Sequence, residues 1–244
     1  MRVLITGASG FVGGAVAAAA LAAGHEVVGL VRDPARAVRA AGADLRRGDM
    51  LEPASYVPLV GEVDAVVHTA QLGVGGRLTR RKARQIFDAD ALMTRELASA
   101  CAARGTRFVY TGGCFDWGDR GDAWIDDATP LDPSPMGVGH ARQAAMLDAM
   151  AGDGAKRSST PPAGEGLDVV RVSPGFVYGP GGLFKEAFVD QVRARRLRCI
   201  GAGQNWWSCV HVDDLAAPTS PPWSTPRPAL STPSPTRSRS GCAS

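Results

Sequence analysis

TGASGFVGG, residues 6–14, follows the short apolar run RVLIT at residues 2–6 and precedes an alanine-rich stretch. Its glycines at positions 7, 10 and 13 have the GxxGxxG spacing of a phosphate-binding loop between a strand and a helix. Gly7 permits a tight turn, Gly10 has no side chain to obstruct a pyrophosphate, and Gly13 lets the helix pack close to the strand. The helix N-terminus offers free N–H groups and partial positive charge to phosphates. We therefore expect a dinucleotide site rather than a glycine-rich turn without a ligand. The loop residues expected to contact it are Gly7, Ser9, Gly10, Phe11, Val12 and Gly13.

Beyond this loop, apolar runs alternate with helical segments, and no hairpin signal joins successive runs. Strands are expected at residues 2–6, 25–31, 43–49, 63–70, 107–111 and 167–172. Helices are expected at residues 14–23, after Asp33-Pro34, around 53–60, and at 79–104 and 136–151. This alternation predicts an α/β fold, a Rossmann-type doubly wound parallel sheet with helices on both faces. Residues 152–166 are predicted to be a surface loop by composition.

The end of the second strand indicates which dinucleotide binds. An acid there accepts hydrogen bonds from the ribose 2′-hydroxyl of NAD, whereas an arginine accommodates the 2′-phosphate of NADP. The strand ends in Val31 and Arg32, and Arg36 follows one turn later. A guanidinium binds phosphate bidentately, so we expect NADP, with NAD as the alternative. The competing interpretation is that Arg32 is a solvated surface residue and Asp33 an N-cap before Pro34.

Charge and cysteine content exclude several classes of protein. The net charge is +3, and three arginines in the acid-free segment after residue 217 account for all of it. The preceding residues are thus neutral overall, which argues against nucleic-acid binding. The uncharged N-terminal stretch is too short and too rich in glycine to span a membrane.

Five cysteines without a CxxC pair, and four scattered histidines, suggest no disulfide framework and no metal site. A cytoplasmic location fits best.

Five motifs in order resemble the extended short-chain dehydrogenase/reductases, also called the NAD-dependent epimerase/dehydratase family. These motifs are TGASGFVGG at 6–14, HTA at 68–70, FVYTGG at 108–113, SPGFVYGPGG at 173–182 and VHVDDLA at 210–216. The resemblance implies a Rossmann domain at residues 1–166. It also implies that residues 167–217 hold the last strand of the sheet and an incomplete C-terminal substrate lobe. Further cofactor contacts implied by the family are Asp49 and Met50 beside the adenine, His68, Thr69 and Ala70 along the cleft, and Pro174 to Tyr178 bordering the nicotinamide.

The catalytic pattern of this family is absent. Its members use a Ser or Thr after the fifth strand and a Tyr-x-x-x-Lys pair on the next helix. The corresponding positions here are Gly113, Met136 and His140. Neither a thioether nor a glycine has a transferable proton. Candidate substitutes for proton transfer are His140, Thr111 and Tyr178, set against the interpretation that His140 is an exposed helical residue and Thr111 packs at a strand end.

Two functions follow from these observations. The first is an NADP-dependent reductase, epimerase or dehydratase acting on a carbonyl or sugar-nucleotide substrate. The second is a catalytically degenerate NADP(H)-binding sensor or regulatory protein. Family members often dimerise through the helices after the fourth and fifth strands, so the resemblance makes a homodimer one possible assembly, although the sequence does not fix the oligomeric state. No partner beyond a small-molecule substrate is indicated.

The segment 218–244 has a different composition, since 18 of its 27 residues are Pro, Ser or Thr. Such a segment cannot bury a core, and we expect a disordered tail. It has two interpretations, a shifted reading of GC-rich coding sequence or a genuine disordered linker. Translating the other two frames beyond Ala217 separates them.

Overall fold

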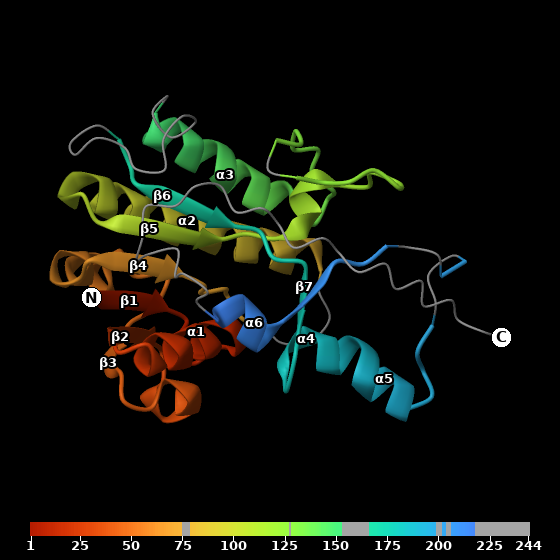
Figure 1. The fold of residues 1–244 in the computed structure, drawn as a ribbon, viewed down its shortest axis with the longest axis horizontal. Helices are drawn as coiled ribbons and strands as arrows, with labels where there is room; N and C mark the ends of the chain where they lie inside the picture. Colours follow the sequence, from red (N-terminus) through yellow and green to blue (C-terminus); the bar gives the residue numbers. More distant parts are fainter. Residues whose placement is uncertain (75–78, 127, 153–165, 199–201, 204–205, 218–244) are drawn as a thin grey trace.

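A computed structural model describes residues 1–74, 79–126, 128–152, 166–198, 202–203 and 206–217 (Figure 1). The predicted tail at 218–244 lies outside the described residues, as does nearly all of the predicted surface loop at 152–166. No helix within the described ranges is long and apolar enough to cross a membrane.

Six strands form one parallel sheet in the order β3-β2-β1-β4-β5-β6. The strands are β1 (Arg2–Thr6), β2 (Glu26–Val31), β3 (Asp44–Arg47), β4 (Ala65–His68), β5 (Arg107–Thr111) and β6 (Val169–Val172). The predicted Rossmann-type parallel sheet is thus confirmed. The strand order reverses between β1 and β4, and open α/β sheets bind ligands outside the carboxyl ends of the strands at such a point.

Two apolar layers cover the sheet, because successive residues of a strand point to opposite faces. Leu4, Val66, Phe108 and Tyr110 face the layer formed by α2 (Arg80–Arg104) and α3 (Val138–Ala151). The alternate positions Val3, Ile5, Val67 and Val109 face the layer formed by α1 (Phe11–Ala22) and α6 (Val212–Ala216). Figure 1 shows these helices on the two sides of the sheet. Complete burial of a side chain of this size contributes about 1.5–3 kcal/mol, so the two layers hold the strand ends in fixed positions.

The long helices lie close to their expected bounds. The Thr79 side chain accepts a hydrogen bond from the Lys82 N–H at the start of α2, and Gly105 ends that helix in the left-handed conformation. The helix predicted for residues 14–23 instead begins at Phe11. Glycine has a low helix propensity, but Gly13 and Gly14 pack closely against Gly7 and Ala8 of the loop after β1 and are helical here.

Two predicted helices are shorter and tighter than expected. After Asp33, which caps Ala35 N–H as predicted for an N-cap, the chain forms the single 3-10 turns η1 (Pro34–Arg36) and η2 (Val38–Ala40). The expected helix at 53–60 is split into the 3-10 segments η3 (Pro53–Ser55) and η4 (Val57–Glu62). Pro58 lacks the N–H that a continuous α-helix would need there.

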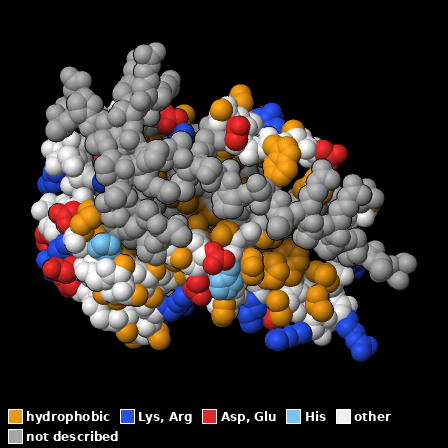
Figure 2. Space-filling model, viewed as in Figure 1, with side chains coloured by type: hydrophobic (Ala, Val, Ile, Leu, Met, Phe, Trp, Pro, Cys, Tyr) orange, Lys and Arg blue, Asp and Glu red, His pale blue; other side chains and the backbone are white. Residues whose placement is uncertain are grey.

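A smaller unit follows β6. It contains the parallel pair β7 (Phe176–Tyr178) and β8 (Cys209–His211), the helical run α4 (Gly182–Phe184), η7 (Lys185–Val189) and α5 (Asp190–Arg193), and then α6. Trp207 packs edge-on against Phe176 and Phe188. Exposed hydrophobic side chains gather on this unit over α4 and β7 (Figure 2). The domain boundary at residue 166 stays a prediction.

The N-terminus of α6 is capped by a histidine. The helix begins at Val212, and His211 Nδ1 accepts a hydrogen bond from Asp213 N–H at 3.2 Å. Asp213 lies in the first turn and pairs with Arg39 at 2.6 Å. Both acids suit the positive end of the helix dipole, which makes their role structural.

Candidate functional site

A pocket of about 630 Å³ opens at the carboxyl edge of the sheet, where the strand order reverses. Its wall is built by the segments that follow β1, β2, β3, β4, β5 and β6, together with residues of α2, α3 and α4. These wall segments include Gly7, Ser9 to Gly13, Leu30 to Arg32, Thr69 to Gln71, Gly112 to Phe115 and Pro174 to Val177. Residues from six separate loops therefore meet at one place, as the parallel topology requires.

The glycine loop forms one end of the pocket. Gly7 has φ +71° and a Cβ there would lie 2.9 Å from Ala70 Cα, so this turn favours glycine. A Cβ on Gly13 would overlap Gly7 O and lie 2.5 Å from Thr69 Oγ1. A Cβ on Gly10 would approach only Gly7 O, at 3.0 Å, with nothing else within 4 Å. The loop is therefore tight against the protein at Gly7 and Gly13 and open to the pocket at Gly10.

The start of α1 is a potential anion site. Gly10 is its N-cap and supplies no side-chain cap, and Phe11, Val12 and Gly13 of the first turn line the pocket. The uncapped first turn of a twelve-residue helix leaves N–H groups and the positive end of a dipole beside an open space. These residues fit the diphosphate of a dinucleotide.

The pocket extends from this loop toward the ends of β2 and β3. Arg32 lines it with an exposed side chain, and Gly48 and Met50 line the adjoining wall. Asp49 is not among the lining residues, and its carboxylate accepts a hydrogen bond from Leu51 N–H at 2.9 Å. No carboxylate among the described residues forms an ion pair with Arg32.

The segment after β4 forms the floor. Thr69 and Ala70 line the pocket, while His68 is buried beneath them with 1% exposure. The Thr6 hydroxyl joins the three residues, because its Oγ1 accepts hydrogen bonds from Thr69 N–H at 3.1 Å and Ala70 N–H at 3.2 Å and lies 2.7 Å from His68 Nδ1. His68 thus supports the floor from below.

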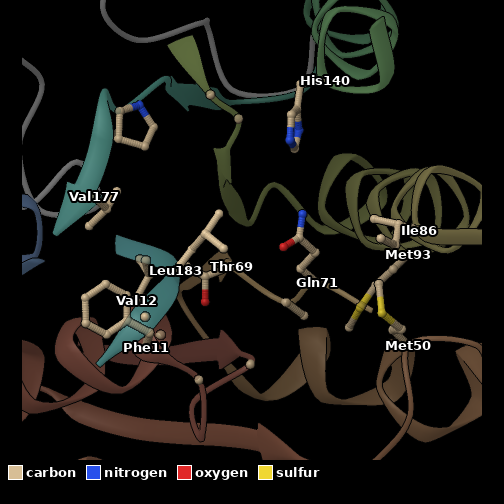
Figure 3. Close-up of a pocket in the computed structure, with 18 of the residues that line it drawn as sticks. Phe11, Val12, Met50, Thr69, Gln71, Ile86, Met93, His140, Val177 and Leu183 are labelled. Atoms are coloured by element: carbon tan, nitrogen blue, oxygen red, sulfur yellow. The ribbon is translucent and has the colours of Figure 1, made fainter. Parts of the chain in front are cut away.

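The three positions that correspond to the family's catalytic Ser/Thr, Tyr and Lys lie together at the end of the pocket opposite the glycine loop. Gly113, Met136 and His140 all line the pocket, and Figure 3 shows the His140 ring pointing into it toward the amide of Gln71. Thr111 is not a lining residue, because it follows Tyr110 in β5 and so faces the opposite side of the sheet from His140. Tyr178 lies outside the lining residues, edge-on to His211.

Behind His140 lies a hydrogen-bonded pair that was not singled out from the sequence. His140 Nδ1 lies 2.8 Å from the Tyr110 hydroxyl, and that hydroxyl donates to Asp90 Oδ2 at 3.1 Å. Tyr110 and Asp90 are 2% and 7% exposed. Burial, and then the neighbouring Asp90, raise the pKa of Tyr110 far above its ordinary value, so the phenol stays protonated.

Asp116 is a second acid near this end of the pocket, in η5 (Cys114–Trp117). It is 3% exposed, and its Oδ1 has no hydrogen-bond partner among the described residues. Burial raises the pKa of Asp116 to about 6, and the charges of His140 and Arg171 act in the opposite direction. Neither acid was expected from the sequence, although Asp90 interrupts the apolar stripe of its helix.

The sheet order and the glycine loop define a Rossmann-fold protein with a ligand pocket at the strand reversal. The model of the NAD dependent epimerase/dehydratase family matches residues 3–218, and the chain belongs to this family.

Two relatives and one solved structure illustrate the similarity. A 2-alkyl-3-oxoalkanoate reductase of Stenotrophomonas maltophilia is 26% identical over 219 residues, which are 88% of this chain and 63% of the relative. A 4-hydroxy-2-methyl-3-oxo-4-farnesyl-3,4-dihydroquinoline-1-oxide ketoreductase of Stigmatella aurantiaca is 28% identical over 220 residues, 88% of this chain and 62% of the relative. DesIV, a dTDP-glucose 4,6-dehydratase from Streptomyces venezuelae solved with NAD and TYD bound, shares the fold with a TM-score of 0.72 at 23% identity, covering 88% and 70% of the two chains. The chain spans less than two thirds of the length of both reductases.

Proposed function

We propose that this chain binds a nicotinamide dinucleotide along the pocket and carries out hydride chemistry on a carbonyl or sugar-nucleotide substrate. The observation that carries the proposal is the uncapped first turn of α1 facing the pocket at Gly10, with His140 at the opposite end. Family membership and relatives named as reductases support an enzyme over a catalytically degenerate sensor.

The residues along the pocket suggest how the cofactor would be held. The diphosphate would accept hydrogen bonds from the first turn of α1, and the adenosine would lie toward Met50. Thr69 and Ala70 would support the middle of the cofactor, and Pro174 would border the nicotinamide. Asp49 and His68 would act indirectly, by ordering the backbone on which those contacts depend.

Arg32 supports a preference for NADP over NAD. Its exposed guanidinium lines the pocket beside the end of β2, where the adenosine ribose is expected. A 2′-phosphate would accept paired hydrogen bonds from it. Because no described carboxylate competes for this guanidinium, its charge is available to a ligand.

The chemistry needs a proton donor at the substrate oxygen. When bound, the nicotinamide supplies or removes hydride at the carbonyl carbon. Met136 has no proton to transfer, and burial raises the pKa of the lining Cys114 thiol, which keeps it protonated. An imidazole ring can both donate and accept a proton, and the His140 ring lines the pocket, so we assign proton transfer to His140. Thr111 and Tyr178 are less suitable since neither lines the pocket.

A titration of protein fluorescence with NADPH and NADH tests cofactor binding. Gly10→Ala would place a methyl group in the open space of the loop, and we expect a loss of at least about tenfold in affinity, equal to about 1.4 kcal/mol. Gly14→Ala is the matched control, because Gly14 lies one residue beyond the lining part of α1 and a Cβ there meets Ala8 O and Arg39 at 3.3 Å. Equal affinity in wild type and Gly10→Ala would overturn the proposal.

We further propose a cytoplasmic homodimer that acts on small molecules. The arrangement would pair α2 and α3 of one copy with those of another, as family members do. Light scattering of the purified chain tests the stoichiometry, and a monomer at micromolar concentration would contradict it.

A further inference from the structure

A buried row of side chains connects His140 to the centre of the sheet. Tyr110 of β5 lies between His140 of α3 and Asp90 of α2, with hydrogen-bond distances of 2.8 Å and 3.1 Å. On the far side of Asp90, Oδ1 lies 3.7 Å from His68 Nε2. The pocket therefore has one imidazole at its edge that is held from behind by a phenol and an acid.

Proton counting fixes the direction of the first hydrogen bonds. Tyr110 has one hydroxyl proton and donates it to Asp90 Oδ2, since an ionised carboxylate can only accept. The Tyr110 oxygen then accepts from His140, so the proton of the neutral imidazole lies on Nδ1. His140 Nε2 is left with its lone pair directed away from Tyr110, and the ring points into the pocket (Figure 3).

The hydrogen bonds of Thr6 determine which ring nitrogen of His68 carries the proton. Thr6 Oγ1 already accepts from two backbone N–H groups, so its own proton is donated to His68 Nδ1. The proton of the neutral His68 ring therefore lies on Nε2, which faces Asp90 Oδ1 at 3.7 Å and has no hydrogen-bond partner among the described residues. Asp90 thus accepts a hydrogen bond from Tyr110 on one side and has the N–H of His68 facing it on the other.

We propose that Tyr110 and Asp90 are positioning residues for His140, which hold its proton on Nδ1 and leave Nε2 free to exchange a proton with a carbonyl oxygen in the pocket. This inference rests on the proposed function. In a reduction, a bound reduced nicotinamide would supply the hydride to the carbonyl carbon and would itself be left oxidised. The proton on Nε2 of the imidazolium passes to the carbonyl oxygen, which gives an alcohol and neutral His140. Nδ1–H remains donated to Tyr110 throughout, and Asp90 offsets the charge of the imidazolium through the phenol.

Other charged groups also face this imidazole. Asp116 of η5 interacts electrostatically with His140. The charges of His140 and of Arg171 in β6 both act to lower the pKa of Asp116. Asp116 forms no hydrogen bond with His140 among the described contacts, whereas Tyr110 does. Asp116 therefore contributes to the field at the ring, while Tyr110 and Asp90 determine which nitrogen carries the proton.

Nitrogen NMR of the ¹⁵N-labelled protein tests the tautomer without any turnover. We expect His140, assigned by its loss in His140→Ala, to show the Nδ1–H tautomer when neutral. Tyr110→Phe removes the acceptor, and a mixture of tautomers is expected. A neutral His140 protonated on Nε2 in the wild type would overturn the inference even if the protein is inactive.

Kinetics with NADPH and ethyl 2-methylacetoacetate as the carbonyl probe give the second test. Tyr110→Phe is expected to lower kcat by about 10- to 100-fold, within the range that general acid–base groups contribute, with the NADPH dissociation constant unchanged. Asp90→Asn retains an oxygen that accepts from Tyr110 but removes the charge, so the alkaline fall in kcat/KM should move to lower pH. Tyr56→Phe is the control, because that buried hydroxyl only approaches Met50 O at 3.5 Å.

Different variants test proton transfer by His140 and the positioning role of Tyr110 and Asp90. If His140→Ala retains the wild-type rate, the assignment of proton transfer to His140 is wrong. If His140→Ala is inactive but Tyr110→Phe and Asp90→Asn both match wild type in rate and pH profile, the positioning role is wrong. Thermal melting of each variant separates loss of folding from loss of function.

Discussion

The ring of Phe87 lies directly against Gly139, so α2 and α3 approach each other at a point where a side chain would not fit. A Cβ at position 139 would lie 2.7 Å from Phe87 Cε1 and closer still to Cδ1. The next residue on α3 is His140, whose ring reaches Tyr110. The missing side chain at 139 therefore sets the helix separation on which the geometry of the site depends.

Gly139→Ala should lower the free energy of unfolding by about 1 kcal/mol, because the cost of overpacking exceeds the gain in helix propensity. With Phe87→Ala already present, the same change should instead stabilise the protein, by up to about 1 kcal/mol. Urea denaturation of the four variants measures this reversal of sign. An equal effect in both backgrounds would show that the ring does not limit the approach.

Arg32→Ala should weaken NADPH binding by about 10- to 100-fold, the loss expected for hydrogen bonds to a charged group, and leave NADH binding nearly unchanged. The ratio of the two dissociation constants is the measurement. Arg95→Ala removes the same charge from an exposed side chain of α2 that does not line the pocket, and it serves as the control. A parallel loss of affinity for both nucleotides would argue against 2′-phosphate recognition.

Asp116 should make the protein less stable as the pH rises through its titration. Because burial raises its pKa from 3.8 to about 6, the folded state binds a proton more tightly than the unfolded state. Stability from this group is therefore largest below pH 3.8 and is lost between there and about pH 6, on the order of 3 kcal/mol in total.

Asp116→Asn should remove that slope, and it should stabilise the protein at pH 7.5 relative to wild type. Unfolding at several pH values in urea provides the comparison, with Asp119→Asn on the exposed neighbouring turn as control. An unchanged slope in Asp116→Asn would mean that another group carries the pH dependence.

Alkylation of the folded protein should discriminate between two thiols. Cys101 is fully buried and burial raises its pKa to about 12, whereas Cys209 is exposed. Since the thiolate is the reactive form, iodoacetamide at pH 8 should modify Cys209 at least about tenfold faster, with tenfold corresponding to one pKa unit. Peptide mass spectrometry follows both sites, and in urea the two rates should converge.

The main sheet could be predicted from the sequence because its strands, except the polar β3 at one edge, are short, mostly apolar runs between glycine or polar segments. RVLIT and RFVYT lie within the sheet with the bounds expected for them. The short helices were harder to predict. Helices were expected after Asp33-Pro34 and around residues 53–60, but proline and the short distance to the next strand allow only 3-10 turns there.

Part of the candidate site could likewise be predicted from the sequence, and part could not. The glycine loop is contiguous in sequence, so its meeting with a helix N-terminus could be predicted from the order of the residues alone. The row of His140, Tyr110 and Asp90 joins three elements whose members are 20 and 30 residues apart. One signal was available, an acid at position 90 among the apolar residues Ala89, Met93 and Leu97, because an acid is rarely buried without a partner. Which partner it has depends on how α2 and α3 pack.

The place of β1 inside the sheet has a consequence for synthesis on the ribosome. Thr6 pairs with Leu30 on one side and with His68 on the other, and the second partner lies 62 residues further along the chain. Until that partner leaves the exit tunnel, the first hydrophobic strand of the nascent polypeptide has one open edge, and open edges recruit other chains. Ribosomes that pause before this point would display the most aggregation-prone intermediate, and chaperone engagement should be greatest there.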